Sequence, residues 1–208
     1  MRPLTIAVPK GRVLKQLAPL FARAGIDTTS LLADDRTLLR ETPDGAVRFL
    51  LLKPDDVPTY VEFGAADLGV AGRDVLLERQ YDLYLPLDLG IGRCRMVVAA
   101  PEGAGPAPDV PRVATKYPRI TTEHFAARGM SVEVIYVQGS VELAPLVGLA
   151  DVIVDLVETG STLAENHLVV REEITSISSV LIANRAAYKL RAAQVAPIVD
   201  ALRAAVGG

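Results

Sequence analysis

Cysteine and histidine are scarce in this chain of 208 residues. The single cysteine, Cys94, cannot form a disulfide within the chain, which excludes an internally cross-linked scaffold. The two histidines, His124 and His167, lack metal-ligand spacing, which argues against a protein-bound zinc site. Cys94 stands between two arginines, a setting that can activate a thiol, although a reduced structural cysteine is the simpler interpretation.

Long runs of one kind of residue are also missing. No block of Lys and Arg exceeds a pair, and 25 acidic against 22 basic residues give a net charge of −3, so we expect no nucleic-acid surface. The first residues, MRPLTIAVPKGR, lack the apolar core and cleavage site of a signal peptide, and no apolar run reaches membrane-spanning length. We therefore expect a cytoplasmic protein with no membrane partner.

Short apolar runs alternate with helical patterns along the chain. Strands are predicted at residues 4–8, 47–52, 67–70, 95–100, 112–115, 132–137, 152–157 and 180–183. Helices are predicted at residues 12–24, 56–63, 74–79, 122–128, 141–149 and 189–205. This alternation favours an α/β fold with mixed, mostly parallel sheets covered on both faces.

The chain length allows one large domain or two small ones. Residues 101–111, PEGAGPAPDVP, are too rich in Pro and Gly for regular structure, and we interpret them as a surface loop, although a domain linker would have the same composition. Crossings near residues 89–93 and 176–179 would carry the chain out of a first lobe and back. The expected lobes are residues 1–92 with 180–208, and residues 93–179.

The stretch VIVDLVETGSTL, residues 152–163, joins a β-branched strand to carboxylates and then to small polar residues. Ligands bind at the carboxyl ends of strands in open α/β sheets. A glycine lets backbone N–H groups approach a ligand, and hydroxyls with a following helix N-terminus favour an anion. The stretch therefore predicts a phosphate cradle beside Asp155 and Glu158, formed by Thr159, Gly160, Ser161 and Thr162. The alternative is an ordinary turn that Ser161 or Thr162 caps, with solvated acids.

Charged residues follow other predicted strands as well. Lys10, Gly11 and Arg12 follow the first strand, where cations oppose the positive end of a helix dipole and so need an anionic partner. Arg73 and Asp74 are placed similarly after residues 67–70, although Asp74 could instead be a helix N-cap.

Two further strand ends carry candidate residues. Glu142 either reaches a magnesium-bound phosphate or completes a capping arrangement around Ser140. Lys116 is a candidate phosphate contact, whereas Tyr117 is expected to pack in the core.

Four separated stretches, in this order and spacing, resemble the catalytic subunit of the ATP phosphoribosyltransferase family over essentially the whole chain. They are AVPKGR at 7–12, KPDDVPTYVEFGAADLGVAGRDVL at 53–76, VATKYPRIT at 113–121, and QGSVELAPLVGLADVIVDLVETGSTL at 138–163. The resemblance implies transfer of the 5-phosphoribosyl group of phosphoribosyl pyrophosphate to N1 of the adenine of ATP, which opens histidine biosynthesis. It also implies a two-lobed fold like the type II periplasmic binding proteins, with a cleft between the lobes.

The resemblance also implies roles for the residues named above. ATP would be met in the first lobe by Lys10, Gly11, Arg12, Arg73 and Asp74. Phosphoribosyl pyrophosphate would be met in the second lobe by Glu142, Asp155, Glu158, Thr159, Gly160, Ser161 and Thr162. Lys10, Arg12 and Asp155 would be catalytic, with Arg12 at the leaving pyrophosphate, and Mg²⁺ would be carried by the substrate phosphates and not by protein ligands.

The chain ends at RAAVGG and so resembles the short form of the family. Short forms work in a hetero-oligomer with a regulatory subunit related to histidyl-tRNA synthetase, and a dimer of catalytic chains is expected. His167 stands where a glycine is expected, which puts the turn after the cradle in doubt.

Two alternatives remain at this point. A solute receptor or the effector domain of a regulator has the same two-lobed architecture without catalysis, but the missing signal peptide and DNA-binding segment argue against both. A phosphoribosyltransferase with another acceptor is the enzymatic alternative.

Overall fold

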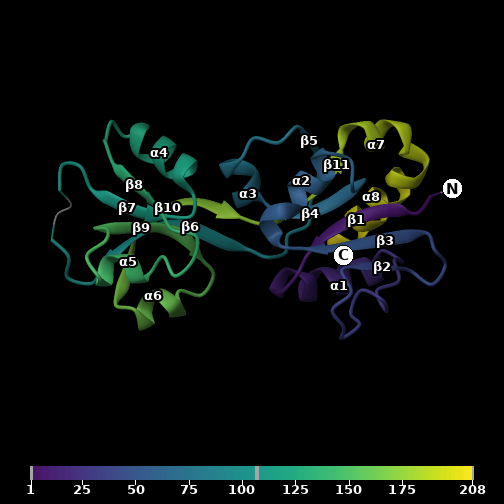
Figure 1. Cartoon of the computed structure of the whole chain (residues 1–208), viewed down its shortest axis with the longest axis horizontal. Coiled ribbons are helices and arrows are strands. Elements are labelled where there is room, and N and C mark those ends of the chain that lie inside the picture. The colour runs from purple at the N-terminus through teal and green to yellow at the C-terminus, as the bar shows by residue number, and fades with distance from the viewer. Residues whose placement is uncertain (1, 106–107, 208) are drawn as a thin grey trace. The chain divides into compact units, whose positions relative to one another are not determined.

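The computed structural model describes residues 2–105 and 108–207 and divides into two compact units (Figure 1). Unit 1 comprises Met1–Gly92 and Ser178–Gly208, and unit 2 comprises Arg93–Ile177. The expected second crossing left Ser178 and Ser179 in the second lobe, whereas both belong to unit 1. The reason is that Ser179 exchanges backbone hydrogen bonds with unit 1, donating to Ile91 (2.8 Å) and accepting from Leu89 (3.0 Å).

Unit 1 is built on a six-stranded sheet in the order β2-β3-β1-β4-β11-β5. Its elements are β1 (Leu4–Pro9), α1 (Arg12–Arg23), β2 (Leu39–Glu41), β3 (Val47–Leu52), the 3₁₀ turn η1 (Pro54–Asp56), α2 (Val57–Glu62), β4 (Leu68–Gly72), α3 (Arg73–Glu78), β5 (Leu83–Asp88), β11 (Ser179–Asn184), α7 (Arg185–Leu190) and α8 (Ala192–Gly207). Strand β1 runs parallel to β3 and β4, while β11 runs antiparallel to β4 and β5. Helices α1 and α8 pack in the apolar cluster on one face of the sheet, and α2 packs in the cluster on the other.

A buried carboxylate joins distant parts of unit 1. Asp67 is 2% exposed and precedes β4. It accepts hydrogen bonds from the backbone N–H of Thr5 (2.9 Å) and from Nη2 of Arg2 (2.9 Å). It also forms an ion pair with Arg191, which lies between α7 and α8. The start of the chain and its last helices are therefore fixed to the centre of the sheet through one side chain.

Unit 2 is built on a five-stranded sheet in the order β10-β6-β9-β7-β8. Its elements are β6 (Cys94–Pro101), β7 (Arg112–Thr115), α4 (Pro118–Ala126), β8 (Glu133–Tyr136), α5 (Leu143–Leu146), β9 (Val152–Val157), α6 (Ser161–Glu165) and β10 (Leu168–Ile177). Two apolar clusters cover the sheet: one includes Ile153 and Val157 with α5, and the other includes Val154 and Tyr117 with α4. The packing predicted for Tyr117 is confirmed, since it is 4% exposed.

Several elements differ from the sequence prediction. Strands β2, β5 and β10 were not predicted, and all three pair antiparallel, so the sheets are mixed without a parallel majority. Strand β10 has the sequence LVVREEITSI and lies at the sheet edge, where charged side chains interrupt the apolar pattern. The helix predicted at 141–149 shrinks to the four residues of α5, and the terminal helix is divided at Arg191.

The predicted loop at 101–111 and the prediction of no membrane-spanning segment remain to be compared with the structure. The loop predicted at 101–111 includes residues 106 and 107, which lie outside the described residues, as does Gly208. Over the part of the chain that the structure describes, no helix combines the length and the apolarity that a membrane crossing requires.

Candidate active site

The predicted phosphate cradle lies at the carboxyl end of β9 in unit 2. Glu158, Thr159, Ser161 and Thr162 are exposed, and Gly160 has a φ of 85°, in the left-handed region that favours glycine. Gly160 is the N-cap of α6, which has no side-chain cap hydrogen bond, so the alternative in which Ser161 or Thr162 caps the helix is wrong. The Thr159 hydroxyl instead lies 3.1 Å from the Ser161 hydroxyl. Three hydroxyls and a glycine turn thus face solvent beside the end of a buried strand.

Asp155 lies within strand β9, three residues before Glu158, the acid that directly precedes the cradle. Its Oδ1 accepts the backbone N–H of Leu156 at 2.8 Å. The pKa of the Asp155 carboxyl is raised to about 6, first by burial and also by the negative charge of Glu142, against the lowering effects of the Leu156 N–H and the Lys116 ammonium. A partly buried carboxyl group whose pKa is raised in this way is typical of functional sites.

Glu142 and Lys116 therefore surround Asp155, one with like charge and one with opposite charge. Glu142 occupies the N-cap position of α5 and makes no side-chain cap hydrogen bond, and Ser140 has a φ of 49°. The predicted capping arrangement around Ser140 is thus wrong, and Glu142 precedes α5, whereas it lay inside the helix predicted at 141–149. Lys116 was predicted only as a phosphate contact, and its closeness to Asp155 depends on strand pairing that the sequence does not state.

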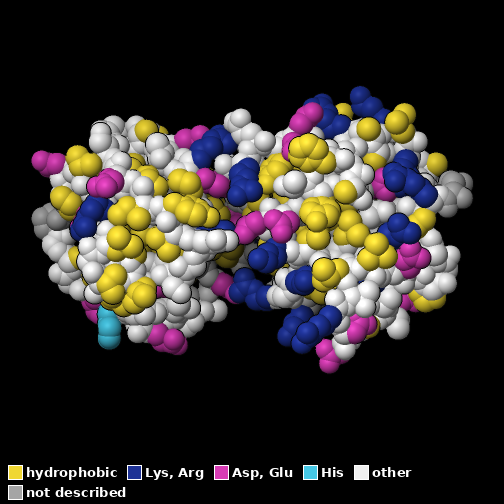
Figure 2. Space-filling view, viewed as in Figure 1, with side chains coloured by type: hydrophobic (Ala, Val, Ile, Leu, Met, Phe, Trp, Pro, Cys, Tyr) yellow, Lys and Arg dark blue, Asp and Glu magenta, His cyan; other side chains and the backbone are white. Residues whose placement is uncertain are grey.

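The predicted cation pair lies at the start of α1 in unit 1. Lys10 and Arg12 are exposed and flank Gly11, the N-cap residue, whose φ of 91° favours glycine. Neither a side-chain cap nor an acidic residue is present in the first turn of this 12-residue helix. Figure 2 shows Lys and Arg side chains gathered over α1 on the visible face of unit 1. Backbone N–H groups, the positive helix end and two cations all favour an anion at this place.

Arg73 begins α3, where the parallel strands β1 and β4 end at the same edge of the sheet. Its Nη2 lies 3.3 Å from Oδ2 of Asp88, which also accepts the Ser178 hydroxyl at 2.8 Å. Although burial opposes it, the Gly90 N–H, the Ser178 hydroxyl and Arg73 hold the pKa of Asp88 below its ordinary value. Arg73 is thus engaged by residues that the sequence analysis missed, because Asp88 ends the unpredicted strand β5.

Asp74 is 8% exposed and lies in the first turn of α3. The N-cap of this helix is Gly72, so the alternative in which Asp74 caps the helix is wrong. A Cβ on Gly72 would lie 2.1 Å from Oδ1 of Asp74, which no real contact allows. Position 72 must therefore be glycine for Asp74 to hold this orientation.

His167 occupies the position after the cradle where a glycine was expected. Its φ of 54° lies in the left-handed region, and its N–H donates to the Ala164 carbonyl at 3.1 Å, which ends α6. A glycine is favoured at such a position for steric reasons, and a histidine is among the side chains that tolerate it. The turn after the cradle therefore forms with His167.

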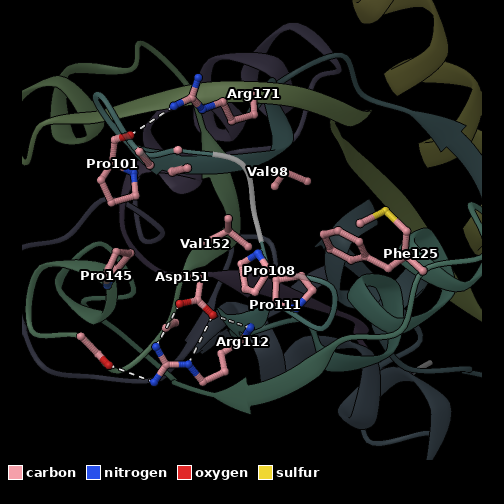
Figure 3. A pocket seen from close by; sticks show the side chains of 16 residues that line it. Val98, Pro101, Pro108, Pro111, Arg112, Phe125, Pro145, Asp151, Val152 and Arg171 are labelled. Carbon is pink, nitrogen blue, oxygen red and sulfur yellow. Dashed lines mark hydrogen bonds and ion pairs between the residues drawn. The ribbon is translucent and has the colours of Figure 1, made fainter.

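A cavity of about 800 Å³ also lies in unit 2 (Figure 3). Its lining is mainly proline and aliphatic, and its polar part is the ion pair between Arg112 and Asp151 (Nη2 to Oδ1, 2.9 Å) with Arg171, which donates to the Pro101 carbonyl (3.2 Å). None of the predicted site residues is among the described residues that line it. None of the described residues that line it carries a hydroxyl group that could donate to a phosphate, so the candidate active site is the cradle with its neighbours.

The positions of the His, Cys, Asp and Glu side chains show whether the described residues could hold a metal ion. Among residues 2–105 and 108–207, no three His, Cys, Asp or Glu side chains gather in a way that could hold one. Magnesium keeps several waters and is commonly bound through one or two carboxylates together with substrate phosphates. A magnesium ion that arrives on a polyphosphate would then be held by the phosphates and by water.

Comparison with known proteins agrees with this arrangement. The family model HisG, ATP phosphoribosyltransferase, matches residues 53–204. An ATP phosphoribosyltransferase of Sorangium cellulosum is 66% identical over 207 residues, covering 100% of this chain and 98% of the relative. One of Acidithiobacillus ferrooxidans is 52% identical, covering 98% and 97%.

Solved structures extend the comparison. The ATP phosphoribosyl transferase (HisG:HisZ) complex from Thermotoga maritima contains a chain that is 35% identical with a TM-score of 0.84, covering 98% of this chain and 97% of that one. The alkanesulfonate-binding protein SsuA of Xanthomonas axonopodis pv. citri, bound to MOPS, has a TM-score of 0.60 at 13% identity, covering 99% and 73%, and this likeness shows the fold alone. The expected fold, that of the type II periplasmic binding proteins, is confirmed. The family match and the relatives that cover the whole chain show that it belongs to the HisG family of ATP phosphoribosyltransferases.

Proposed function

We propose that this enzyme transfers the 5-phosphoribosyl group of phosphoribosyl pyrophosphate to N1 of the adenine of ATP, the first step of histidine biosynthesis. The observation that carries the proposal is the hydroxyl-lined Gly160 turn next to Asp155 at the end of β9. A ribose 5-phosphate offers a dianion to such a turn and hydroxyl donors to the neighbouring carboxylates.

The chemistry requires charge stabilisation more than a base. The N1 lone pair forms a bond to ribose C1 while the C1–O bond to pyrophosphate breaks, and pyrophosphate leaves with the electron pair. Positive charge grows on the ribose ring and negative charge on the leaving group. Fixed groups of opposite charge therefore lower the barrier, together with the alignment of the two substrates.

On the phosphoribosyl side, the backbone N–H groups and hydroxyls of residues 159–162 would hold the 5-phosphate. Asp155 and Glu158 would accept the ribose hydroxyls, and the Asp155 charge would stabilise the cationic ring. Glu142 would complete this side of the site near the magnesium-bound pyrophosphate. Magnesium, carried by the substrate phosphates, would neutralise part of the leaving-group charge.

On the ATP side, Lys10, Gly11 and Arg12 would meet the polyphosphates, with Arg12 at the departing pyrophosphate. The Arg73 guanidinium has five N–H donors, so it can contact a phosphate while it stays paired with Asp88. Asp74 would accept a hydrogen bond from ATP in the orientation that Gly72 allows.

The test is pyrophosphate release from the purified full chain with Mg²⁺. We expect release only when ATP and phosphoribosyl pyrophosphate are supplied together, with formation of an N1-linked product. Release with another base or nucleotide in place of ATP would show a different acceptor. Saturable binding of either substrate without any release would show a ligand-binding module and contradict the proposal.

Arg12→Ala supplies the matched variant for this assay. We expect single-turnover chemistry to slow by roughly 10- to 100-fold, since a hydrogen bond to a charged group contributes about 1.5–3 kcal/mol. Arg203→Ala removes another exposed arginine, paired with Asp200 on α8, and should leave the rate unchanged. An unchanged chemical step with weaker ATP binding in Arg12→Ala would make Arg12 a nucleotide anchor.

We also propose that the chain works in a hetero-oligomer with a histidyl-tRNA-synthetase-like subunit and pairs with a second catalytic chain. The likeness to the HisG:HisZ complex supports the first part. We expect the subunit to raise activity and to confer inhibition by histidine, and coupling requires that substrates then alter histidine affinity in the complex. Calorimetric titration of histidine into the isolated chain is the control. Saturable binding there, coupled to inhibition, would place the regulatory site on this chain.

A further inference from the structure

Strand pairing brings Lys116 next to Asp155. Strands β7 and β9 are parallel neighbours in the register Val113 to Val152, Ala114 to Ile153 and Thr115 to Val154. Continuing this register by one residue sets Lys116 beside Asp155, just beyond the end of β7. Paired residues of parallel strands present their side chains on the same face of the sheet. Lys116 itself lies in the bend after β7, with its Nζ 5.9 Å from the centroid of the Tyr117 ring, and from this edge of the sheet its positive charge acts on the Asp155 carboxylate.

That face is the one that α5 covers. Ile153 and Val157, which alternate with Asp155 along β9, pack in the same apolar cluster as Val141 and Ala144. Glu142 follows Val141 directly and is half-buried at the start of α5. A second carboxylate thus approaches Asp155 from the helix that packs on its face of the sheet.

The charges of Glu142 and Lys116 act in opposite directions on the protonation of Asp155. Burial and Glu142 favour the protonated carboxyl, whereas Lys116 and the Leu156 N–H favour the carboxylate. Lys116 is the cationic side chain that acts on the Asp155 carboxyl, and Glu142 is the anionic one. The protonation of Asp155 near neutral pH therefore depends on the balance between these two neighbours.

We propose that Lys116 is a positioning residue that holds Asp155 as a carboxylate for the phosphoribosyl substrate, against the charge of Glu142. The inference rests on the proposed function, because an ionised Asp155 is what the developing ribose cation requires. Lys116 acts here through Asp155, and its effect is separate from any contact with a phosphate.

The test compares two variants that are expected to move the titration of Asp155 in opposite directions. In the substrate-free full chain, the side-chain carboxyl ¹³C signal of Asp155 is followed by NMR against pH, with Asp155→Asn to identify it. Lys116→Met should move this titration to higher pH, and Glu142→Gln should move it to lower pH. The expected shift for Lys116→Met is on the order of one pH unit, as for other carboxyls with a nearby opposite charge.

Kinetics provide the second measurement. The acid limb of the kcat/KM profile for phosphoribosyl pyrophosphate should move in the same directions as the NMR titration. Lys116→Arg should restore the wild-type profile, and Lys189→Met, which removes an exposed lysine of α7, should leave it unchanged.

Each outcome decides between distinct explanations. An Asp155 titration that does not move in Lys116→Met would overturn the inference, whatever the activity. Lower activity or stability in Lys116→Met with an unmoved acid limb would show a phosphate contact or a structural role and would also overturn it. The predicted NMR shifts in a chain that releases no pyrophosphate would instead refute the proposed function and remove the substrate role from Lys116.

Discussion

Asp155→Asn is expected to lower kcat/KM by roughly 10- to 100-fold while making the folded chain more stable at neutral pH. The loss of activity follows because the amide keeps the shape of the side chain and removes the charge that faces the ribose. The gain in stability follows because the same charge is costly to bury. One substitution should therefore separate the two roles of this residue.

The pH dependence of the stability effect has a definite sign. The pKa of Asp155 is about 6 in the folded chain, above the ordinary value of 3.8. Between these values the folded state binds more protons than the unfolded state, so the free energy of unfolding falls as pH rises through this window. Above about pH 6 the full cost applies, and its removal should stabilise the chain by on the order of 1–3 kcal/mol.

Urea unfolding at pH 4 and pH 7.5 measures the effect. Asp155→Asn should gain little at pH 4 and most at pH 7.5. Asp151→Asn is the matched control with the opposite sign, because hydrogen bonds from Arg112 lower the pKa of Asp151. Its contribution to stability is present above the ordinary pKa, so this variant should lose stability at pH 7.5. Near-wild-type kinetics in Asp155→Asn would remove Asp155 from the mechanism.

Asp67→Ala is expected to lower the free energy of unfolding by about 3–5 kcal/mol, the usual cost of removing one partner of a buried ion pair. Arg191, whose side chain is 12% exposed, would keep its charge and lose its carboxylate. The backbone N–H of Thr5 and the guanidinium of Arg2 would lose the same acceptor. The effect should therefore extend to both ends of the chain.

Asp200→Ala is the control for this variant, because it breaks an exposed ion pair with Arg203 on α8. Exposed pairs of this kind contribute about 0.2–1 kcal/mol, so its urea midpoint should hardly move. Similar midpoints for the two variants would show that the Asp67 network is not important for stability. Amide hydrogen exchange in β1 and α8 of Asp67→Ala would locate the loosened segments.

The cradle could be predicted from the sequence because the residues that form it are contiguous. The run from Val152 to Val157 is apolar and β-branched, so β9 was predicted with its observed bounds. Gly160 then fixed the turn, and the position of Asp155 on the strand followed from the spacing. Local sequence and local structure agree wherever one strand and its following turn contain the whole arrangement.

Contacts between distant segments could not be predicted in this way. Arg73 meets Asp88 only because β5 pairs with β11, and β5 was not predicted. Lys116 follows Thr115, which the register of β7 with β9 sets opposite Val154, and no local pattern specifies that register. The family resemblance predicts which strand ends carry the site, whereas the charged neighbours of those residues come from pairing across the sheet.

The division of unit 1 into two chain segments has a consequence for folding. Strands β5 and β11 are hydrogen-bonded neighbours, yet all of unit 2 lies between them in the chain. Closing so long a loop costs entropy before the pairing returns any stability. Within unit 2, however, its first and last strands pair with each other, Cys94 opposite Ile177. Once unit 2 has folded, the two ends that lead back to unit 1 leave it side by side, so a folded domain takes the place of the tight turn in an ordinary hairpin.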